Sequence, residues 1–375
     1  MVTVREVTTK RDMRKFVKFP LELYRGCEQY VPLIYADEMK LLGGNPAYSD
    51  VADSALFIAE RDGKVVGRIQ AIIQHSYNEI HDEKRVRFTR FDSINDTEVS
   101  DALFAAAENY GKSRGMNVIC GPLGYSDLDR EGLLIEGFEY EATFEEQYNY
   151  DYYPTLVEHY GFTKEIDWLE FRLFAPDEKD DRFAKIAERV LEMHKLHLVD
   201  LTTMSKNVYI PKYADGIFHC IDECYKHLYG TVPFTESMKK DLIAQFKLLV
   251  SEKYLVLVCD ENERVVSFAL AFPAIGEPLR KSGGRLTLGT IFSLLKLVKK
   301  PKSVDLGLVA ILPEYQNTGL NAVYVNHMMQ SLSSGEITHY ETNLNLETNV
   351  QVMAQWKYLN SKQHKRRRAY FKNIV

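Results

Sequence analysis

Each half of the chain contains a strand–turn–strand pattern of apolar residues. In the first half, residues 55–60 and 65–73 are apolar runs separated by a short polar segment that contains Asp62-Gly63. This dipeptide supplies the positive φ angles that a tight hairpin needs. In the second half, residues 254–259 and 264–272 are similar runs around a polar turn. We therefore expect a β-hairpin at the same place in each half.

The remaining periodicity places strands and helices in a similar order around both hairpins. In residues 97–114, for example, apolar side chains recur at helical spacing and Gly115 ends the pattern. Each half is predicted to run strand, helix, hairpin, strand, helix, strand, helix, strand. The fold class is α/β (α+β) with two domains, residues 1–175 and 176–375, each a mixed, mostly antiparallel sheet flanked by helices. In the second half we expect strands at 196–201, 304–311, 338–344 and 365–372, and helices at 182–194, 213–229, 235–250, 319–332 and 349–359.

Composition and charge narrow the function classes. The chain has 375 residues and a formal net charge of -6, which gives no reason to expect nucleic acid or an anionic membrane as a partner. It contains no apolar run long enough to span a membrane and no signal-peptide pattern at its start. Five scattered cysteines are typical of reduced thiols. We therefore expect a cytoplasmic protein.

The segment 304–322 carries the most informative motif. An apolar strand ends at Leu312-Pro313, and a short loop, residues 316–321, leads directly into a helix. The start of a helix presents free backbone N–H groups and the positive end of the helix dipole, which favour an anion. Gly319 allows the backbone to approach a phosphate closely.

At this point the sequence resembles the GNAT superfamily of acyl-CoA acyltransferases, whose motif is Gln/Arg-x-x-Gly-x-Gly/Ala. Gln316, Gly319 and position 321 are in register with it, although position 321 is Asn321, whose side chain either crowds the phosphate or hydrogen-bonds to it. The resemblance implies acetyl-CoA or another acyl-CoA as cosubstrate, without a metal. It also implies that the backbone from Val309 to Ile311 pairs with the pantetheine arm. The pyrophosphate would be held by the amides of Asn317, Thr318, Gly319, Leu320 and Asn321.

The same resemblance suggests residues for the chemistry. Asn349 corresponds to an asparagine that faces the cofactor arm, and Tyr358 to a tyrosine near the thioester sulfur that would protonate the departing thiolate. The alternative is that Tyr358 only packs. Glu341 and Glu347 lie six residues apart around a predicted strand end, so on a regular strand they would share a face. Either is a candidate general base, or both are exposed strand-end charges.

The first half resembles the same fold without its phosphate loop. No Gln-x-x-Gly precedes its helix, but Gly161-Phe162 follows a short helix as in GNAT proteins. The stretch from Gly121-Pro-Leu-Gly124 through residues 132–138 resembles a bacterial family with tandem GNAT domains, and this resemblance spans most of the chain. We therefore expect this half to shape an acceptor cleft. A charged segment with Asp127, Asp129, Arg130 and Glu131 either lines that cleft or lies on the surface.

Two further segments have alternative interpretations. Cys220, Cys224 and His227 lie near one helix face and are candidate zinc ligands, but a core-facing helix is the favoured interpretation. The insertion 275–302 contains a basic amphipathic stretch, which would form a lid, a homodimer contact or a membrane-surface contact.

The sequence thus predicts an N-acyltransferase that moves an acyl group, acetyl by default, from CoA to a small-molecule or peptide amine. Two alternatives stay open. One is a GNAT-fold protein that binds a ligand or partner without catalysis. The other is a tandem GNAT transferase that uses aminoacyl-tRNA, against which the negative net charge argues.

Overall fold

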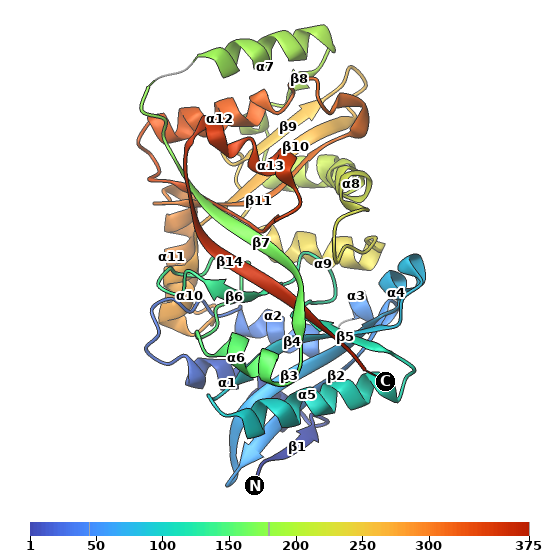
Figure 1. Cartoon of the computed structure of the whole chain (residues 1–375). Helices are drawn as coiled ribbons and strands as arrows, with labels where there is room; N and C mark the ends of the chain where they lie inside the picture. The colour runs from blue at the N-terminus through green and yellow to red at the C-terminus, as the bar shows by residue number, and fades with distance from the viewer. Residues whose placement is uncertain (45, 179–180, 375) are drawn as a thin grey trace.

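A continuous mixed sheet forms the centre of the molecule (Figure 1). The computed structural model describes residues 1–44, 46–178 and 181–374. Along the main path the strand order is β1-β2-β3-β4-β5-β14-β7-β12-β11-β10-β9-β8, with β6 paired to β14 and β13 paired to β7. The strands are β1 (Thr3–Glu6), β2 (Ala52–Arg61), β3 (Lys64–Gln74), β4 (Arg85–Ser93), β5 (Val118–Gly121), β6 (Leu133–Glu136), β7 (Thr163–Phe174), β8 (His197–Leu198), β9 (Leu255–Cys259), β10 (Val265–Pro273), β11 (Val304–Ile311), β12 (Tyr340–Thr342), β13 (Asn345–Leu346) and β14 (Asn360–Asn373).

Helices cover the sheet in both halves. Helix α5 packs on β2, β3 and β4, and α8 packs on β10 and β11. The α-helices are α1 (Lys10–Leu23), α2 (Tyr35–Leu42), α3 (Pro46–Ser49), α4 (His75–His81), α5 (Thr97–Lys112), α6 (Tyr153–His159), α7 (Arg182–Met193), α8 (Lys206–Tyr225), α9 (Glu236–Phe246), α10 (Gly276–Ser282), α11 (Leu288–Lys299), α12 (Ala322–Ser333) and α13 (Val350–Met353). Short 3-10 turns occur at η1 (Leu201–Thr203), η2 (Pro313–Tyr315) and η3 (Trp356–Tyr358).

The final strands of the two halves are exchanged. β7 ends the first half but pairs with β12 and β13 of the second half, and β14 ends the chain but pairs with β5 and β6 of the first. β7 and β14 also pair with each other antiparallel along most of their length. Figure 1 shows them as two long ribbons that connect both ends of the molecule. The two halves therefore share a sheet.

Each half contains one pair of parallel strands that separate after three matched residues. In the first half, β4 and β5 are paired up to Arg87 and Cys120. In the second half, β11 and β12 are paired up to Leu306 and Thr342. Beyond these points the strands diverge, so each half has a gap in its sheet that side chains from elsewhere can line.

The predicted hairpin turn matches the structure, whereas two of the predicted elements in the second half do not. The Asp62-Gly63 hairpin is confirmed, with φ angles of 51° and 75°. The single strand expected at 338–344 is wrong, because the structure has two short strands there, β12 and β13. Between them the Asn345 side-chain amide donates to Thr342 Oγ1 and to the backbone carbonyls of Asn343 and Leu169, which competes with a regular strand ladder. The helix expected at 349–359 is only α13 and η3, where Trp356 Nε1 donates to Asn345 Oδ1.

Candidate functional site

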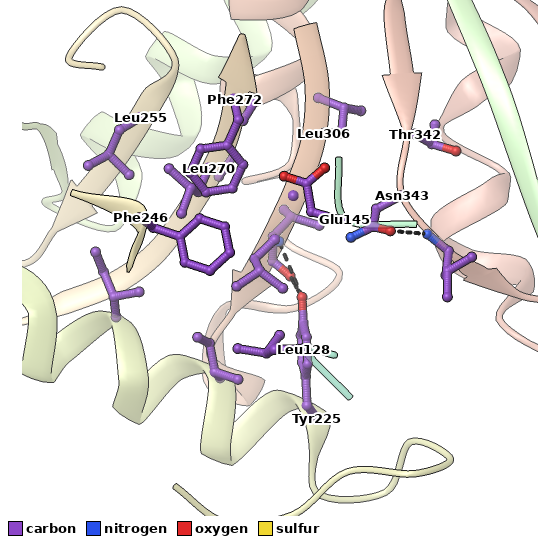
Figure 2. A pocket seen from close by; sticks show the side chains of 18 of the residues that line it. Leu128, Glu145, Tyr225, Phe246, Leu255, Leu270, Phe272, Leu306, Thr342 and Asn343 are labelled. Carbon is purple, nitrogen blue, oxygen red and sulfur yellow. Dashed lines mark hydrogen bonds between the residues drawn. The ribbon is translucent and has the colours of Figure 1, made fainter. Parts of the chain in front are cut away.

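A cavity of about 340 Å³ opens where β11 and β12 separate. Its walls come from α8, α9, β9, β10, β11 and the segment from β12 to η3 (Figure 2). Most of the side chains that α8, α9 and β9–β11 contribute are apolar. They include Ile210, Ala214, Ile217, Phe218, Ile221, Leu242, Ile243, Phe246, Leu255, Leu270, Phe272, Leu306 and Leu308. This chemistry suits a hydrocarbon chain.

The backbone of β11 is irregular beside the cavity. Leu270 and Ala271 of β10 pair with Leu308 and Leu306, so Gly307 is the extra residue of a β-bulge. A side chain at Gly307 would meet the Phe272 ring at 2.9 Å, which explains why glycine fits there. The bulge changes the strand's course at the place where it leaves β12.

The backbone predicted to pair with pantetheine is satisfied by side chains of α8. The Tyr225 hydroxyl donates to the Val309 carbonyl at 2.9 Å and accepts from the Val309 amide at 3.2 Å (Figure 2). The Ile311 carbonyl accepts from Cys224 Sγ at 3.1 Å and from Gln316 Nε2 at 2.9 Å. No backbone strand covers this edge within the described residues, so a ligand that displaces Tyr225 could pair with Val309.

The predicted phosphate loop has the features of an anion site. Asn317 and Gly319 have φ angles of 62° and 91°, and the amides of residues 317–321 donate no hydrogen bond to the described part of the chain. Asn321 is the N-cap of α12 but makes no capping bond; its Nδ2 lies 3.4 Å from Gln355 Oε1. Thr318 Oγ1 donates to the Tyr315 carbonyl. The start of α12 is thus available to an anion.

The equivalent helix in the first half lacks this property. α5 begins at the N-cap Asp96, whose carboxylate accepts from the Glu98 amide. Arg61 forms ion pairs with both of these acids. Two carboxylates at a helix start repel a phosphate. Of these two helix starts, that of α12 is open to an anion and that of α5 is capped, and the phosphate-binding role of the loop before α12 stays a prediction.

The residues predicted for catalysis are not gathered at the cavity. Asn349 lines it, and its Oδ1 also caps α13 by accepting from the Val352 amide. Tyr358 is 39% exposed, packs its ring on Phe183 and does not line the cavity. Glu347 forms an ion pair with Lys164 at 2.8 Å, away from the cavity lining.

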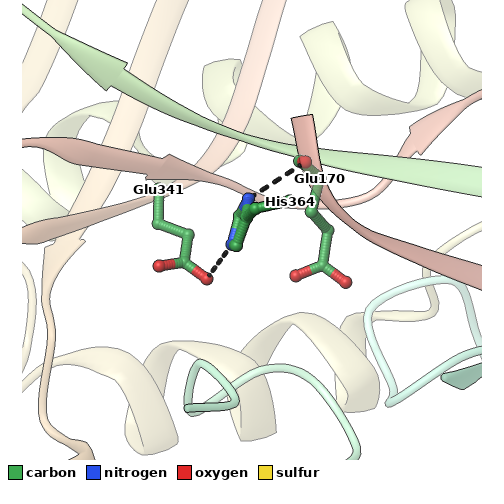
Figure 3. Close-up of side chains that lie close together, drawn as sticks. All are labelled: Glu170, Glu341 and His364. Carbon is green, nitrogen blue, oxygen red and sulfur yellow. Dashed lines mark hydrogen bonds and ion pairs between the residues drawn. The ribbon is translucent and has the colours of Figure 1, made fainter. Parts of the chain in front are cut away.

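Glu341 belongs to a buried, charge-balanced cluster instead (Figure 3). His364 bridges Glu341 and the Glu170 backbone carbonyl through its two ring nitrogens, and the Lys365 ammonium contacts both carboxylates. Burial alone would raise the pKa of Glu341, but the positive charge of Lys365 outweighs burial and holds this pKa far below its usual value. Glu341 is therefore a poor proton acceptor.

The cluster also resembles a metal site in its geometry. Ligand atoms of Glu170, Glu341 and His364 lie within 4.8 Å of one another. The Lys365 ammonium already contacts both carboxylates, and Arg367 Nε donates to Glu170 at 2.6 Å. The chain's own cations thus supply the charge that an ion would bring, and these residues do not fit a metal.

A group of carboxylates from the first half lines the same cavity, and we call it the acidic wall. Its members are Asp127, Asp129, Glu131, Glu145 and Glu146. Burial raises the pKa of Asp127 to about 6 and that of Glu145 to about 7, and raises those of Glu131 and Glu146 well above the usual value. The acidic wall therefore holds protons at a pH where ordinary carboxyl groups are ionised.

Sequence reasoning flagged the first three of these acids but missed Glu145 and Glu146. The run from Glu139 to Glu146 contains four glutamates among turn-forming and aromatic residues, which is typical of a solvated loop. Only the path of the chain turns Glu145 toward β11, where its charge adds to burial in raising the pKa of Asp305. No local pattern carries this information.

A second cavity of about 140 Å³ lies beside the first. It occupies the gap in the first half, where Thr89, Arg90 and Asp92 of β4 extend beyond the last residue paired with β5. The arginines that line it already have partners: Arg68 with Asp92, Arg90 with Glu38, and Arg130 with backbone carbonyls. Five residues line both cavities: Leu128, Asp129, Glu145, Leu242 and Phe246.

Solved structures with the same architecture are known. A tandem GNAT protein from the clavulanic acid biosynthesis pathway superimposes on the whole chain with a TM-score of 0.55 at 11% identity, covering 99% of that protein. This chain has a tandem GNAT fold. A GCN5-related glucosamine N-acetyltransferase region of a fungal β-N-acetylglucosaminidase matches with a TM-score of 0.57 at 11% identity, where the GNAT-fold chain covers 38% of that protein.

Two bacterial proteins resemble the GNAT-fold chain in sequence. Protein YghO of Escherichia coli is 25% identical over 378 residues, covering 99% of this chain and 95% of that protein. The bacterial ceramide synthase of Caulobacter vibrioides is 24% identical over 322 residues, covering 84% and 82%. No protein-family profile matches the chain. No helix in the described residues is long and apolar enough to cross a bilayer.

Proposed function

We propose that this protein is an N-acyltransferase that moves a long acyl chain, rather than acetyl, from an acyl-CoA to an amine. The apolar cavity between β11 and β12 is the observation that carries the proposal. An acetyl group would leave nearly all of a 340 Å³ space without contacts. A hydrocarbon chain would fill it and gain about 0.8 kcal/mol for each methylene group buried.

The surroundings of the cavity support CoA as the carrier. Pyrophosphate fits the start of α12, where the amides of residues 317–321 make no bond within the described chain and Asn321 leaves the helix start uncapped. Gln355 lines the cavity and contacts Asn321, so the loop and the cavity adjoin. The pantetheine arm would replace the Tyr225 hydroxyl at Val309, where the thioester reaches the point at which the strands separate.

The ceramide synthase relative supports amide formation with a long-chain amino alcohol. A ceramide is the amide of a fatty acid with such an amine, and this relative matches most of the chain. We therefore propose that this protein transfers its acyl group to the amine of a 2-amino alcohol.

The test is an acyl-transfer assay with acetyl-, octanoyl- and palmitoyl-CoA against 2-amino alcohols of increasing length. Release of free CoA thiol gives the rate, and mass spectrometry identifies the amide. We expect amide formation with the longer donors and little with acetyl-CoA. Equal or faster transfer of acetyl would refute the chain-length proposal, and no thiol release with any donor would support a non-catalytic binding protein.

A further inference from the structure

We propose that the smaller cavity receives the amine acceptor and that Glu145 takes the proton from its ammonium group. This inference rests on the proposed function and adds to it the acceptor subsite and the general base. Glu145 lines both cavities, so one carboxylate borders the expected acyl donor and the expected amine. Figure 2 shows this carboxylate in the larger cavity, in the view between Leu306 and Asn343.

The position of Glu145 matches the place where the reaction must occur. β11 and β12 remain paired up to Leu306 and Thr342, and the cavity begins there. Asp305 is the neighbouring residue on β11, and Glu145 is the charge that perturbs it most strongly. A thioester carbonyl at the point of separation would therefore lie beside Glu145.

The acidic wall has an unused capacity to accept hydrogen bonds. Glu131 is 3% exposed and lines the larger cavity, yet its Oε1 has no hydrogen-bond partner, and no described residue forms an ion pair with it. Glu145 forms no ion pair with a described residue, and the hydrogen bond that its carboxylate accepts comes from its own backbone amide. Buried carboxyl groups normally have partners, so this arrangement indicates a ligand that supplies N–H donors. A primary ammonium has three.

The electrostatic surroundings allow Glu145 to exchange a proton near neutral pH. Burial raises the pKa of Glu145 to about 7, and the hydrogen bond from its own backbone amide and the nearby Arg130 guanidinium limit that rise. Glu146 and Asp305 are the acids next to it, and burial raises the pKa of both well above the usual value. A base with a pKa near the working pH is the most effective kind.

The chemistry balances without a further reactant. The amine nitrogen forms a bond to the thioester carbonyl carbon, and the carbon–sulfur bond breaks. The ammonium nitrogen loses two protons in becoming an amide nitrogen: Glu145 takes one and later releases it to water, and the thiolate takes the other, so that CoA leaves as a thiol. The remaining cavity wall holds the acyl chain and excludes water.

The experiment compares Glu145→Gln with Glu139→Gln, a matched change at an exposed glutamate of the same segment that lines neither cavity. Single-turnover transfer from palmitoyl-CoA is measured against pH with two nucleophiles: a 2-amino alcohol, which is protonated at neutral pH, and hydroxylamine, which is not. Palmitoyl-CoA binding is measured separately by calorimetry, and folding by circular dichroism.

For Glu145→Gln we expect at least about a 100-fold loss of rate with the amino alcohol. The rate with hydroxylamine and the affinity for palmitoyl-CoA should change little, and Glu139→Gln should behave as wild type. Added formate should restore part of the rate in Glu145→Ala. A rate and pH profile in Glu145→Gln equal to wild type would overturn the inference, and so would a wild type that binds palmitoyl-CoA but transfers to no amine. A wild type that binds no acyl-CoA would overturn the proposed function itself, and this inference with it.

Discussion

Replacement of Ala269 by leucine should shorten the acyl chain that the protein accepts. Ala269 lies on β10, lines the larger cavity and is paired with Val309 and Val256 on the two neighbouring strands. The added isopropyl group would occupy the space of about three methylene groups of a long acyl chain. At about 0.8 kcal/mol for each methylene, the loss is about 2.4 kcal/mol, or about a 60-fold weaker interaction with a chain that fills the cavity.

The assay is the chain-length series of acyl-CoA donors, with kcat/KM determined for each donor. The kcat/KM of the wild type should rise about fourfold with each methylene group added to the donor's acyl chain, until the chain fills the cavity. In Ala269→Leu, kcat/KM should rise by the same factor per methylene group but reach its maximum at a shorter acyl chain. The kcat/KM for acetyl-CoA should not change. Ala105→Leu, on α5 and outside both cavities, is the control. An unchanged profile in Ala269→Leu, or an equal loss with every donor, would refute the assignment of this cavity to the acyl chain.

Three further changes test the surroundings. Tyr225→Phe should raise the affinity for CoA about 30-fold in calorimetry, because the hydroxyl no longer competes for the Val309 backbone through two hydrogen bonds worth about 1 kcal/mol each; weaker binding would show that Tyr225 helps to hold the ligand. Lys365→Met should lower the free energy of unfolding in urea by about 3–5 kcal/mol, since it removes the one cation that contacts both buried carboxylates within the described residues, whereas Lys362→Met at an exposed site should change little; equal effects would contradict the role of the cluster. Glu145→Gln should raise the melting temperature at about pH 8 but not at about pH 4. Burial raises the pKa of Glu145 in the folded protein to about 7, whereas its pKa in the unfolded chain is about 4.3. As the pH rises between these two values the unfolded chain releases the Glu145 proton first, so the stability of the wild type falls. Equal melting temperatures at the higher pH would show that Glu145 is not destabilised by burial.

The sequence predicted those parts of the fold that local residues determine. Asp62-Gly63 specifies its hairpin because the backbone needs positive φ angles there, and the order of apolar runs predicts two similar halves. The exchange of β7 and β14 was not predicted, because an apolar strand carries no local record of which neighbour it pairs with. The break between β12 and β13 depends on bonds from Asn345 to residues around it, which a periodic pattern does not show.

The candidate site likewise has a part that the sequence predicts and a part that it does not. The turn at residues 316–321 and the open helix start that follows it could be predicted, because contiguous residues form them and Gly319 permits the positive φ angle. The acidic wall could be recognised only in part, because its acids acquire raised pKa values from burial between the two halves. Glu341 misled the prediction for the opposite reason: Lys365, distant in the predicted elements, neutralises it in the folded protein.

The central claim is that the cavity between β11 and β12 holds the acyl chain of an acyl-CoA whose pyrophosphate lies at the start of α12. The most direct test is a crystal structure with a non-hydrolysable thioether analogue of palmitoyl-CoA. The account predicts the alkyl chain among Phe246, Leu270 and Leu306, the pyrophosphate on the amides of residues 317–321, and Tyr225 displaced from Val309. An alkyl chain bound elsewhere, with this cavity still empty, would contradict it.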